Sequence, residues 1–192
     1  MWKKTVILIF ALCLCLFTAA CGSSDNGTDG AGSAGAASSA EGSGLEKTGE
    51  IGSFTTTDLN GNEVTEAVFA EKDMTVLHIW GSFCGPCINE MPEVAEFAKG
   101  LPENAQFIGV VCDVSEAKGN EYEDALDILK DSGAEFPNLI TGGGLEDFLG
   151  KIQYVPTTII VDKDGNVIGT PIVGAGVSQY ESAAQKYLDS IS

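Results

Sequence analysis

The sequence contains no arginine and a single histidine, His78. Its 10 basic residues are all lysines, and 28 Asp and Glu outnumber them, which gives a formal net charge of −18 at pH 7. A surface this acidic repels phosphate backbones, so the composition argues against nucleic-acid binding. A zinc site needs about four ligands, whereas the chain offers one CxxC pair and one histidine inside an apolar run. We therefore expect no metal ion and no other cofactor.

The N-terminus holds an apolar run that is short for a membrane-spanning helix. After a basic start, TVILIFALCLCLFTAA supplies about fifteen apolar residues, where a spanning helix needs ~20. Two alanines then lead into Cys21, and this pattern resembles a bacterial lipoprotein signal. The resemblance implies that residues 1–20 are a signal peptide and that the lipid-modified Cys21 holds the chain at the outer face of the cytoplasmic membrane. Thr18 stands where such signals usually have Leu, which leaves an uncleaved N-terminal anchor as the alternative.

The next segment has no means of forming a core. Residues 22–44 contain neither aromatic nor large aliphatic side chains, so they cannot bury enough surface to offset chain entropy. Together with Cys21, residues 21–44 are expected to be a flexible Gly/Ser/Ala linker. The composition becomes globular at about Leu45, and residues 45–192 fit one domain.

Strand-like and helix-like segments alternate through this domain. Runs of strand formers, weak alternation and Asn-Gly or Asp-Gly turn signals predict strands, and apolar residues at helical spacing predict helices. The expected strands are 53–57 with a return from 63, 75–80, 106–111, 157–161 and 167–168; the expected helices are 65–70, 87–100, 121–131, 145–149 and 178–191. This order of elements predicts an α/β sandwich around a mixed sheet of about five strands.

The cysteine pair Cys84-Gly85-Pro86-Cys87 follows directly on an expected buried strand. A purely structural disulfide would close a loop too short to stabilise the fold much. A redox pair fits better, because the N–H groups and the dipole at a helix N-terminus favour a thiolate over a thiol. We therefore expect Cys84 to be the exposed nucleophile at the helix start. Cys87, one turn further and more buried, would attack a mixed disulfide formed at Cys84, and Pro86 suits the first helical turn.

Three separate motifs carry a family resemblance. WGSFCGPCINEMP at 80–92, YVPTT at 154–158 and DKDGNVIG at 162–169 resemble the thioredoxin-like thiol–disulfide oxidoreductases of the TlpA/ResA type. The resemblance covers most of residues 51–192. It implies a thioredoxin-like fold, with a central mixed β-sheet flanked by helices and an N-terminal β-hairpin extension.

The same resemblance implies roles for individual residues. The cysteine pair would be a redox-active disulfide, and Pro156 a cis-proline that faces it. The backbone at Val155 would pair with the bound substrate segment, and Trp80 would belong to the substrate-binding surface. Glu90 would assist proton transfer to and from the cysteines; the alternative is an ordinary solvated helix glutamate.

The resemblance also implies a function in the membrane environment. The chain would reduce disulfides in exported client proteins, and a CcdA-like membrane electron donor would restore its dithiol. The Gly-Pro dipeptide between the cysteines matches that of thioredoxin, whose potential is low, so we expect a reductant. One alternative is a peroxide-reducing enzyme, although Gly81 stands where such enzymes want Thr or Ser. Another is a non-catalytic binding lipoprotein with a static disulfide.

Two further residues, Cys112 and His78, are expected to have structural roles. Cys112 ends the 106–111 run, where a buried free thiol acting as a small apolar residue is the common case; a third redox partner is the alternative. His78 lies inside the expected strand 75–80, and we expect a core residue with a satisfied hydrogen bond rather than a catalyst.

Overall fold

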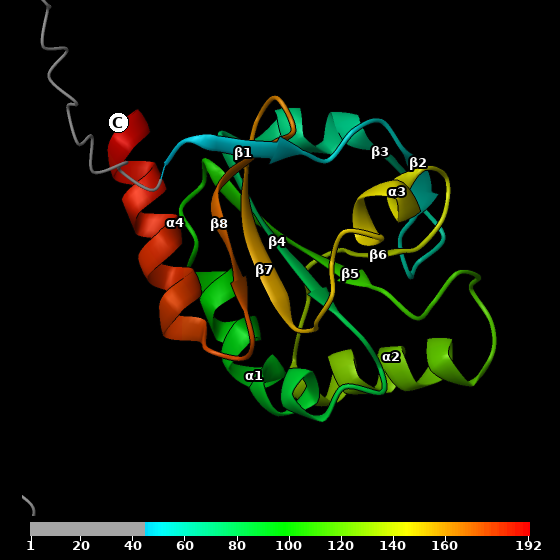
Figure 1. Ribbon diagram of the computed structural model, residues 1–192. Helices are drawn as coiled ribbons and strands as arrows, with labels where there is room; N and C mark the ends of the chain where they lie inside the picture. Colours follow the sequence, from blue (N-terminus) through cyan, green and yellow to red (C-terminus); the bar gives the residue numbers. More distant parts are fainter. Residues whose placement is uncertain (1–44) are drawn as a thin grey trace, which may run out of the picture. The chain divides into compact units, whose positions relative to one another are not determined.

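The computed structural model describes residues 45–192, so the expected signal peptide, Cys21 and the whole of the expected linker lie outside the described residues. These residues form an α/β sandwich around a six-stranded mixed sheet with strand order β1-β8-β7-β4-β5-β6 (Figure 1). Its strands are β1 (Lys47–Glu50), β4 (Met74–Trp80), β5 (Ala105–Val111), β6 (Asn138–Ile140), β7 (Thr157–Asp162) and β8 (Asn166–Val173). A separate hairpin, β2 (Thr55–Thr57) with β3 (Glu63–Thr65), forms the predicted N-terminal extension.

The sheet is built around β4, in which all seven residues are buried. It pairs in parallel with β5 and antiparallel with β7, as expected for a strand that is covered on both faces. The sheet has six strands where about five were expected: β1 and β6 escaped the sequence pattern, whereas β2 and β3 lie in the separate hairpin. Strand β1 has hardly any buried residue and β6 is only three residues long, so neither has enough apolar alternation to be recognised.

Helices cover both faces of the sheet. On one face lie α1 (Gly85–Gly100), α2 (Asn120–Ser132) and α4 (Val177–Ile191), which share a core with Val76 and Trp80. On the other face, the 3₁₀ helix η1 (Glu66–Glu71) and α3 (Leu145–Leu149) share a core with Leu77 and Ile79. Because side chains alternate between the faces of a strand, the even-numbered His78 is on the side of α1 and α4. Among residues 45–192, no helix combines the length and the apolar character needed to cross a membrane.

Two tight turns have the same construction. Asp58 Oδ1 accepts hydrogen bonds from the backbone N–H groups of Asn60 and Asn62, both at 2.8 Å. Asp162 Oδ1 accepts in the same way from Asp164 and Asn166, both at 2.9 Å. Such Asx turns direct the chain back on itself, and they confirm the turns that the Asn-Gly and Asp-Gly signals predicted.

Candidate functional site

The cysteine pair lies where β4 gives way to α1. Cys84 is the N-cap of α1, and Pro86 occupies its first turn, both as expected. A disulfide joins Cys84 and Cys87, whose Cα atoms are 5.3 Å apart. The backbone N–H of Cys87 points at Cys84 Sγ over 3.3 Å. The first turn of a helix leaves its N–H groups without backbone partners, so an anionic sulfur at Cys84 would find a donor already in place.

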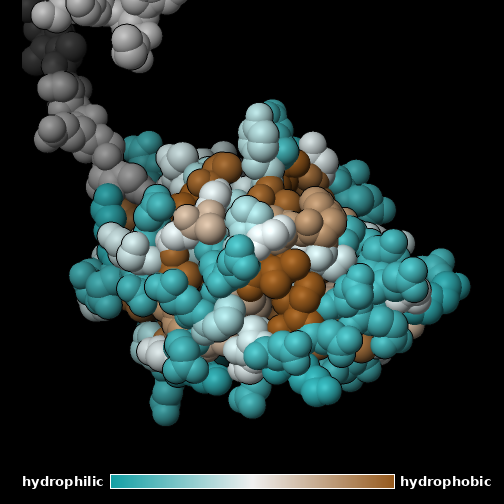
Figure 2. Space-filling model, turned by 90° about the horizontal axis from the view of Figure 1, so that it is seen from below, coloured by the Kyte–Doolittle hydropathy of each residue, from teal (hydrophilic) through white to brown (hydrophobic). Residues whose placement is uncertain are grey.

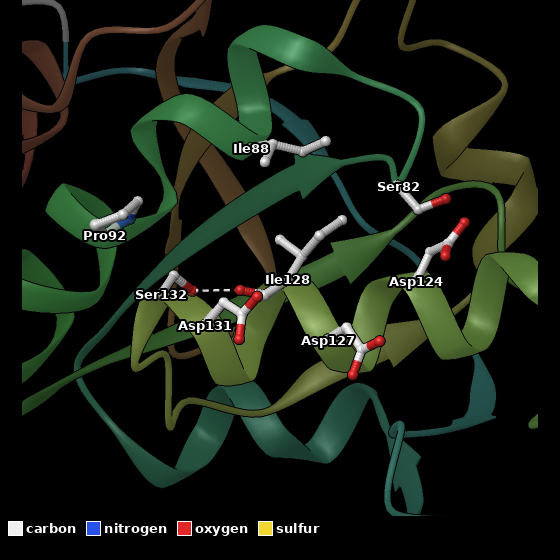
Figure 3. Close-up of a pocket in the computed structure, with 8 residues that line it drawn as sticks. All are labelled: Ser82, Ile88, Pro92, Asp124, Asp127, Ile128, Asp131 and Ser132. Carbon is white, nitrogen blue, oxygen red and sulfur yellow. Dashed lines mark hydrogen bonds between the residues drawn. The ribbon is translucent and has the colours of Figure 1, made fainter.

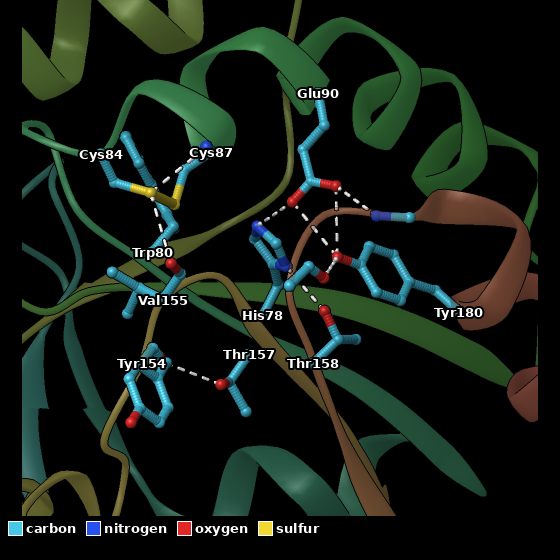
Figure 4. Close-up of polar contacts among 12 residues, drawn as sticks. His78, Trp80, Cys84, Cys87, Glu90, Tyr154, Val155, Thr157, Thr158 and Tyr180 are labelled. Atoms are coloured by element: carbon cyan, nitrogen blue, oxygen red, sulfur yellow. Dashed lines mark hydrogen bonds and ion pairs between the residues drawn. A yellow bond between two sulfur atoms is a disulfide. The ribbon is translucent and has the colours of Figure 1, made fainter. Parts of the chain in front are cut away.

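The loop before β7 lies against this disulfide. The peptide bond between Val155 and Pro156 is cis, which confirms the expected cis-proline. The carbonyl oxygen of Val155 is 3.6 Å from Cys84 Sγ (Figure 4). Thr157 Oγ1 donates a 2.7 Å hydrogen bond to the carbonyl oxygen of Tyr154, which ties the loop to the start of the strand. The disulfide therefore faces a fixed stretch of backbone.

The surface around the disulfide is partly apolar. Cys84 was expected to be exposed, but only 6% of it is accessible, and Cys87 is completely buried. Two flanking aromatic side chains are exposed instead: Phe83 is 70% accessible and Tyr154 is 67% accessible. They line a groove of about 380 Å³ with the half-buried Cys112. Figure 2 shows an apolar area in the middle of the face seen from below, with hydrophilic side chains around it.

A second groove, of about 400 Å³, runs between α1 and α2 (Figure 3). Ile88 from α1 and Ile128 from α2 contribute apolar side chains to it, and the aspartates of α2 contribute charge. Ser82, at the edge of this groove, donates a 2.6 Å hydrogen bond to Asp113 and so fixes the loop that leads to the cysteines. In residues 45–192, no group of three or more acidic, cysteine or histidine side chains is arranged to hold a metal ion.

Glu90 is buried one turn after Cys87, with only 7% of it exposed. Its carboxyl accepts a 3.0 Å hydrogen bond from the N–H of Gly176 and lies 3.2 Å from the hydroxyl of Tyr180 on α4 (Figure 4). Burial raises the pKa of Glu90, against the opposing effect of these hydrogen bonds. A carboxyl that is shielded from solvent and has a raised pKa is suited to exchanging protons. The alternative of an ordinary solvated glutamate is therefore wrong.

His78 approaches the same carboxyl from β4. Its ring is fully buried, and burial lowers its pKa to about 3, so the imidazole is neutral. Nδ1 lies 2.8 Å from Thr158 Oγ1, but Nε2 has no hydrogen-bond partner and is 3.8 Å from Glu90 Oε1. The expectation of a core histidine is confirmed. Its hydrogen bonding is satisfied at one ring nitrogen only.

Comparison with known proteins agrees with this geometry. Residues 46–185 match the Redoxin family. The chain belongs to the Redoxin family. It is 30% identical over 120 residues to thiol-disulfide oxidoreductase ResA of Bacillus thuringiensis subsp. konkukian, a match that covers 62% of this chain and 65% of that protein. The match to the sporulation thiol-disulfide oxidoreductase A of Bacillus subtilis is 25% identical over 100 residues and covers 51% of this chain and 58% of that protein.

Solved structures show that this Redoxin-family chain has a thioredoxin-like fold. The thioredoxin domain of a thiol-disulfide oxidoreductase from Bacteroides vulgatus aligns with a TM-score of 0.59 at 21% identity, covering 73% of this chain and 97% of that one. The crystal structure of StoA from Bacillus subtilis aligns with a TM-score of 0.55 at 21% identity, covering 69% and 96% respectively. The predicted fold class is therefore confirmed.

One site residue of this Redoxin-family chain needs correction, and others had no sequence signal. Trp80 was expected on the substrate-binding surface, yet it is fully buried, and its indole N–H donates a 2.9 Å hydrogen bond to Asn138 Oδ1. Trp80 is the last residue of β4, which is buried along its whole length, and it packs into the core shared with α1, α2 and α4, so its side chain shapes the site from within. Tyr180 and Thr158 went unrecognised as partners of the site, because no local pattern connects them with Glu90 or His78.

Proposed function

We propose that the protein is a thiol–disulfide oxidoreductase that reduces disulfides in exported client proteins. The observation that carries the proposal is the Cys84–Cys87 disulfide at the start of α1, with Cys84 Sγ next to the carbonyl of Val155. The similarity to proteins named thiol-disulfide oxidoreductase ResA supports the same chemistry.

The proposed reaction begins from the reduced pair. The Cys84 thiolate attacks one sulfur of a client disulfide; the client bond breaks, and its other sulfur leaves as a thiolate. Cys87, once deprotonated, then attacks Cys84 Sγ, which breaks the mixed disulfide and releases the second client sulfur. The client gains two electrons, and the protein is left as the Cys84–Cys87 disulfide. A donor dithiol, supplied in our proposal by a CcdA-like membrane protein, returns two electrons and completes the cycle.

The backbone beside the disulfide is the proposed binding place of the client. In our proposal, the client segment lies along Val155 and Pro156, so that its disulfide approaches Cys84 from the open side. Phe83 and Tyr154 would contact residues next to the client cysteine, because both are exposed and border the groove. The lipid on Cys21 and the linker through residue 44 would hold this domain at the outer face of the cytoplasmic membrane.

A trapping experiment tests the proposal. Cys87→Ala leaves Cys84 unable to release its mixed disulfide, so client proteins should stay attached and be identified by mass spectrometry. The matched variant Cys84→Ala should capture none. Capture by both variants, or by neither, would count against the proposed order of attack.

A redox titration tests the direction of electron flow. We expect a reduction potential close to that of thioredoxin, about −270 mV, and not one close to that of strong oxidants, about −120 mV. A value near the latter would make the protein an oxidant. Peroxide consumption in the presence of a supplied dithiol would favour the peroxide-reducing alternative.

A further inference from the structure

The described residues contain one fully buried side-chain nitrogen without a hydrogen-bond partner, and it faces the site. This atom is Nε2 of His78, and the nearest acidic oxygen is Glu90 Oε1 at 3.8 Å. Buried polar groups are nearly always paired, because leaving one unpaired forfeits its hydration without replacement. A group between β4 and α1 that can form a hydrogen bond with Nε2 is therefore expected.

The second ring nitrogen of His78 already has a partner. His78 Nδ1 and Thr158 Oγ1 are 2.8 Å apart, and the hydroxyl can accept a hydrogen from Nδ1. In that arrangement the hydrogen of the ring lies on Nδ1. Since a neutral imidazole carries one N–H, Nε2 is left as a bare acceptor.

The hydroxyl of Tyr180 determines how many hydrogen-bond donors the carboxyl of Glu90 has. Its hydroxyl is 2.9 Å from the carbonyl oxygen of Gly174 and 3.2 Å from either oxygen of Glu90. If its hydrogen goes to the closer oxygen, that of Gly174, Glu90 keeps one donor, the N–H of Gly176. A bare Nε2 opposite a carboxylate would be repelled, whereas the O–H of a protonated carboxyl would complete the arrangement.

We propose that His78 is a positioning residue: when Glu90 is protonated, its carboxyl closes the 3.8 Å gap to His78 and donates a hydrogen bond to Nε2. This rests on the proposed function and deepens it. When Cys87 attacks Cys84 Sγ, the Cys84–client bond breaks and the client sulfur leaves with the electron pair. The thiol proton of Cys87 passes to the ionised carboxylate of Glu90, which becomes the protonated carboxyl that His78 holds. When the donor dithiol reduces the disulfide, Glu90 returns the proton to the Cys87 sulfur.

The groups around Glu90 favour this placement of the proton. On its own helix, Glu93 raises the pKa of Glu90 further through charge repulsion. From α4 it faces Tyr180, whose pKa is raised to about 12, so the phenol stays neutral. From β4 it faces the neutral His78, whose other ring nitrogen contacts the Thr158 hydroxyl of β7, a group that does not titrate. Among residues 45–192, His78 is the one basic group within ion-pair distance of Glu90.

The single histidine makes the proposal directly measurable. In the ¹⁵N-histidine-labelled, oxidised protein at neutral pH, we expect NMR to find the hydrogen on Nδ1 and none on Nε2. The Nε2 resonance should move as Glu90 titrates, because the hydrogen bond is lost with the carboxyl proton. In Glu90→Gln, whose amide can donate, Nε2 should stay hydrogen-bonded at every pH. A hydrogen on Nε2 across the whole pH range would overturn the proposal, and so would a Nε2 resonance that ignores the ionisation of Glu90.

A matched pair of variants tests whether His78 Nδ1 donates its hydrogen to Thr158. Thr158→Val removes the acceptor of the Nδ1 hydrogen, so the hydrogen should shift toward Nε2. Thr75→Val removes an equally buried hydroxyl whose recorded contact is with Gln106, and it should leave the imidazole unchanged. Equal spectra for the two variants would overturn the assignment. Should Thr158→Val fail to fold, the unaltered protein and Glu90→Gln still decide it.

A functional measurement separates this proposal from the proposed function. His78→Asn, too short to reach Glu90, should lower the proton affinity of that carboxyl about tenfold, the equivalent of one hydrogen bond. With Cys87 present, the pH profile for release of a client from its mixed disulfide with Cys84 should shift toward lower pH, and His78→Gln should recover part of the shift. An unmoved profile or a higher affinity would overturn the role of His78. Absence of any disulfide exchange in the unaltered protein would instead overturn the proposed function, while the ¹⁵N resonances would still test the hydrogen bond.

Discussion

Replacing Gly109 with alanine should disturb the site from inside the sheet. Gly109 lies in β5 directly opposite Asn138 of β6. A Cβ atom at position 109 would lie 1.9 Å from Asn138 Oδ1 and 3.2 Å from the ring of Phe136. The same Oδ1 accepts the indole N–H of Trp80, four residues before Cys84. Because Asn138 is only 3% exposed, its side chain cannot turn aside into solvent.

The magnitude follows from what the alanine displaces. Moving the Asn138 side chain leaves the buried indole N–H of Trp80 without a partner, which costs about 1–3 kcal/mol. Forcing a methyl group into a packed core costs about 1–3 kcal/mol more. Removing glycine from a strand returns up to ~1 kcal/mol. Gly109→Ala should therefore lower the free energy of unfolding by about 1–6 kcal/mol.

Urea denaturation followed by circular dichroism measures this loss. Gly100→Ala is the matched control, because no atom lies within 4 Å of its new Cβ, and it should be neutral or slightly stabilising. The double variant Gly109→Ala with Asn138→Ala should relieve the strain but should not restore the lost hydrogen bond. If Gly109→Ala costs no more than the control, the reasoning from Asn138 to Trp80 is refuted.

Three further predictions concern the site. Because the folded protein raises the pKa of Glu90, it binds this proton more tightly than the unfolded chain does. The stability contribution is present at low pH and lost as pH rises through the folded pKa; Glu90→Gln should flatten that decline in urea titrations, and an unchanged slope would contradict it. Phe83→Ala and Tyr154→Ala should each change stability by less than about 0.5 kcal/mol, as usual for surface positions, while slowing reduction of a protein disulfide; unchanged rates would exclude a contact with the client. Burial and the charge of Asp113 raise the pKa of Cys112, so in the reduced protein at pH 7 maleimide should label it more slowly than Cys84, and mass spectrometry would detect the reverse order.

The parts of the fold that the sequence predicts are those with local signals. β4, β5 and β7 are continuous runs of strand formers and were located to within about two residues, the usual uncertainty of element boundaries. α3 was placed at 145–149, as observed. β1 is recognisable only in the folded sheet, because it depends on its antiparallel partner β8 rather than on apolar residues of its own.

The same distinction applies to the site. The N-cap position of Cys84 could be predicted because a strand, a cysteine and Pro86 follow one another along the chain. The partners of Glu90 could not, because Gly176 and Tyr180 lie 86 and 90 residues further on. Trp80 was misplaced because closeness to the cysteines in sequence does not bring a side chain to the surface: β4 is covered on both faces up to its last residue.

The geometry of β4 unites these observations. Its alternation places His78 and Trp80 on one face, beneath α1, where the indole fixes the strand end through Asn138 and the imidazole faces Glu90. Both are completely buried, so water cannot take the place of a missing partner. A proton entering or leaving this region must therefore be held by its own side chains. In such surroundings an ionised Glu90 carboxylate is costly. The redox pair lies one turn before Glu90, and it can exchange electrons freely only if the proton of the Cys87 thiol has a defined acceptor.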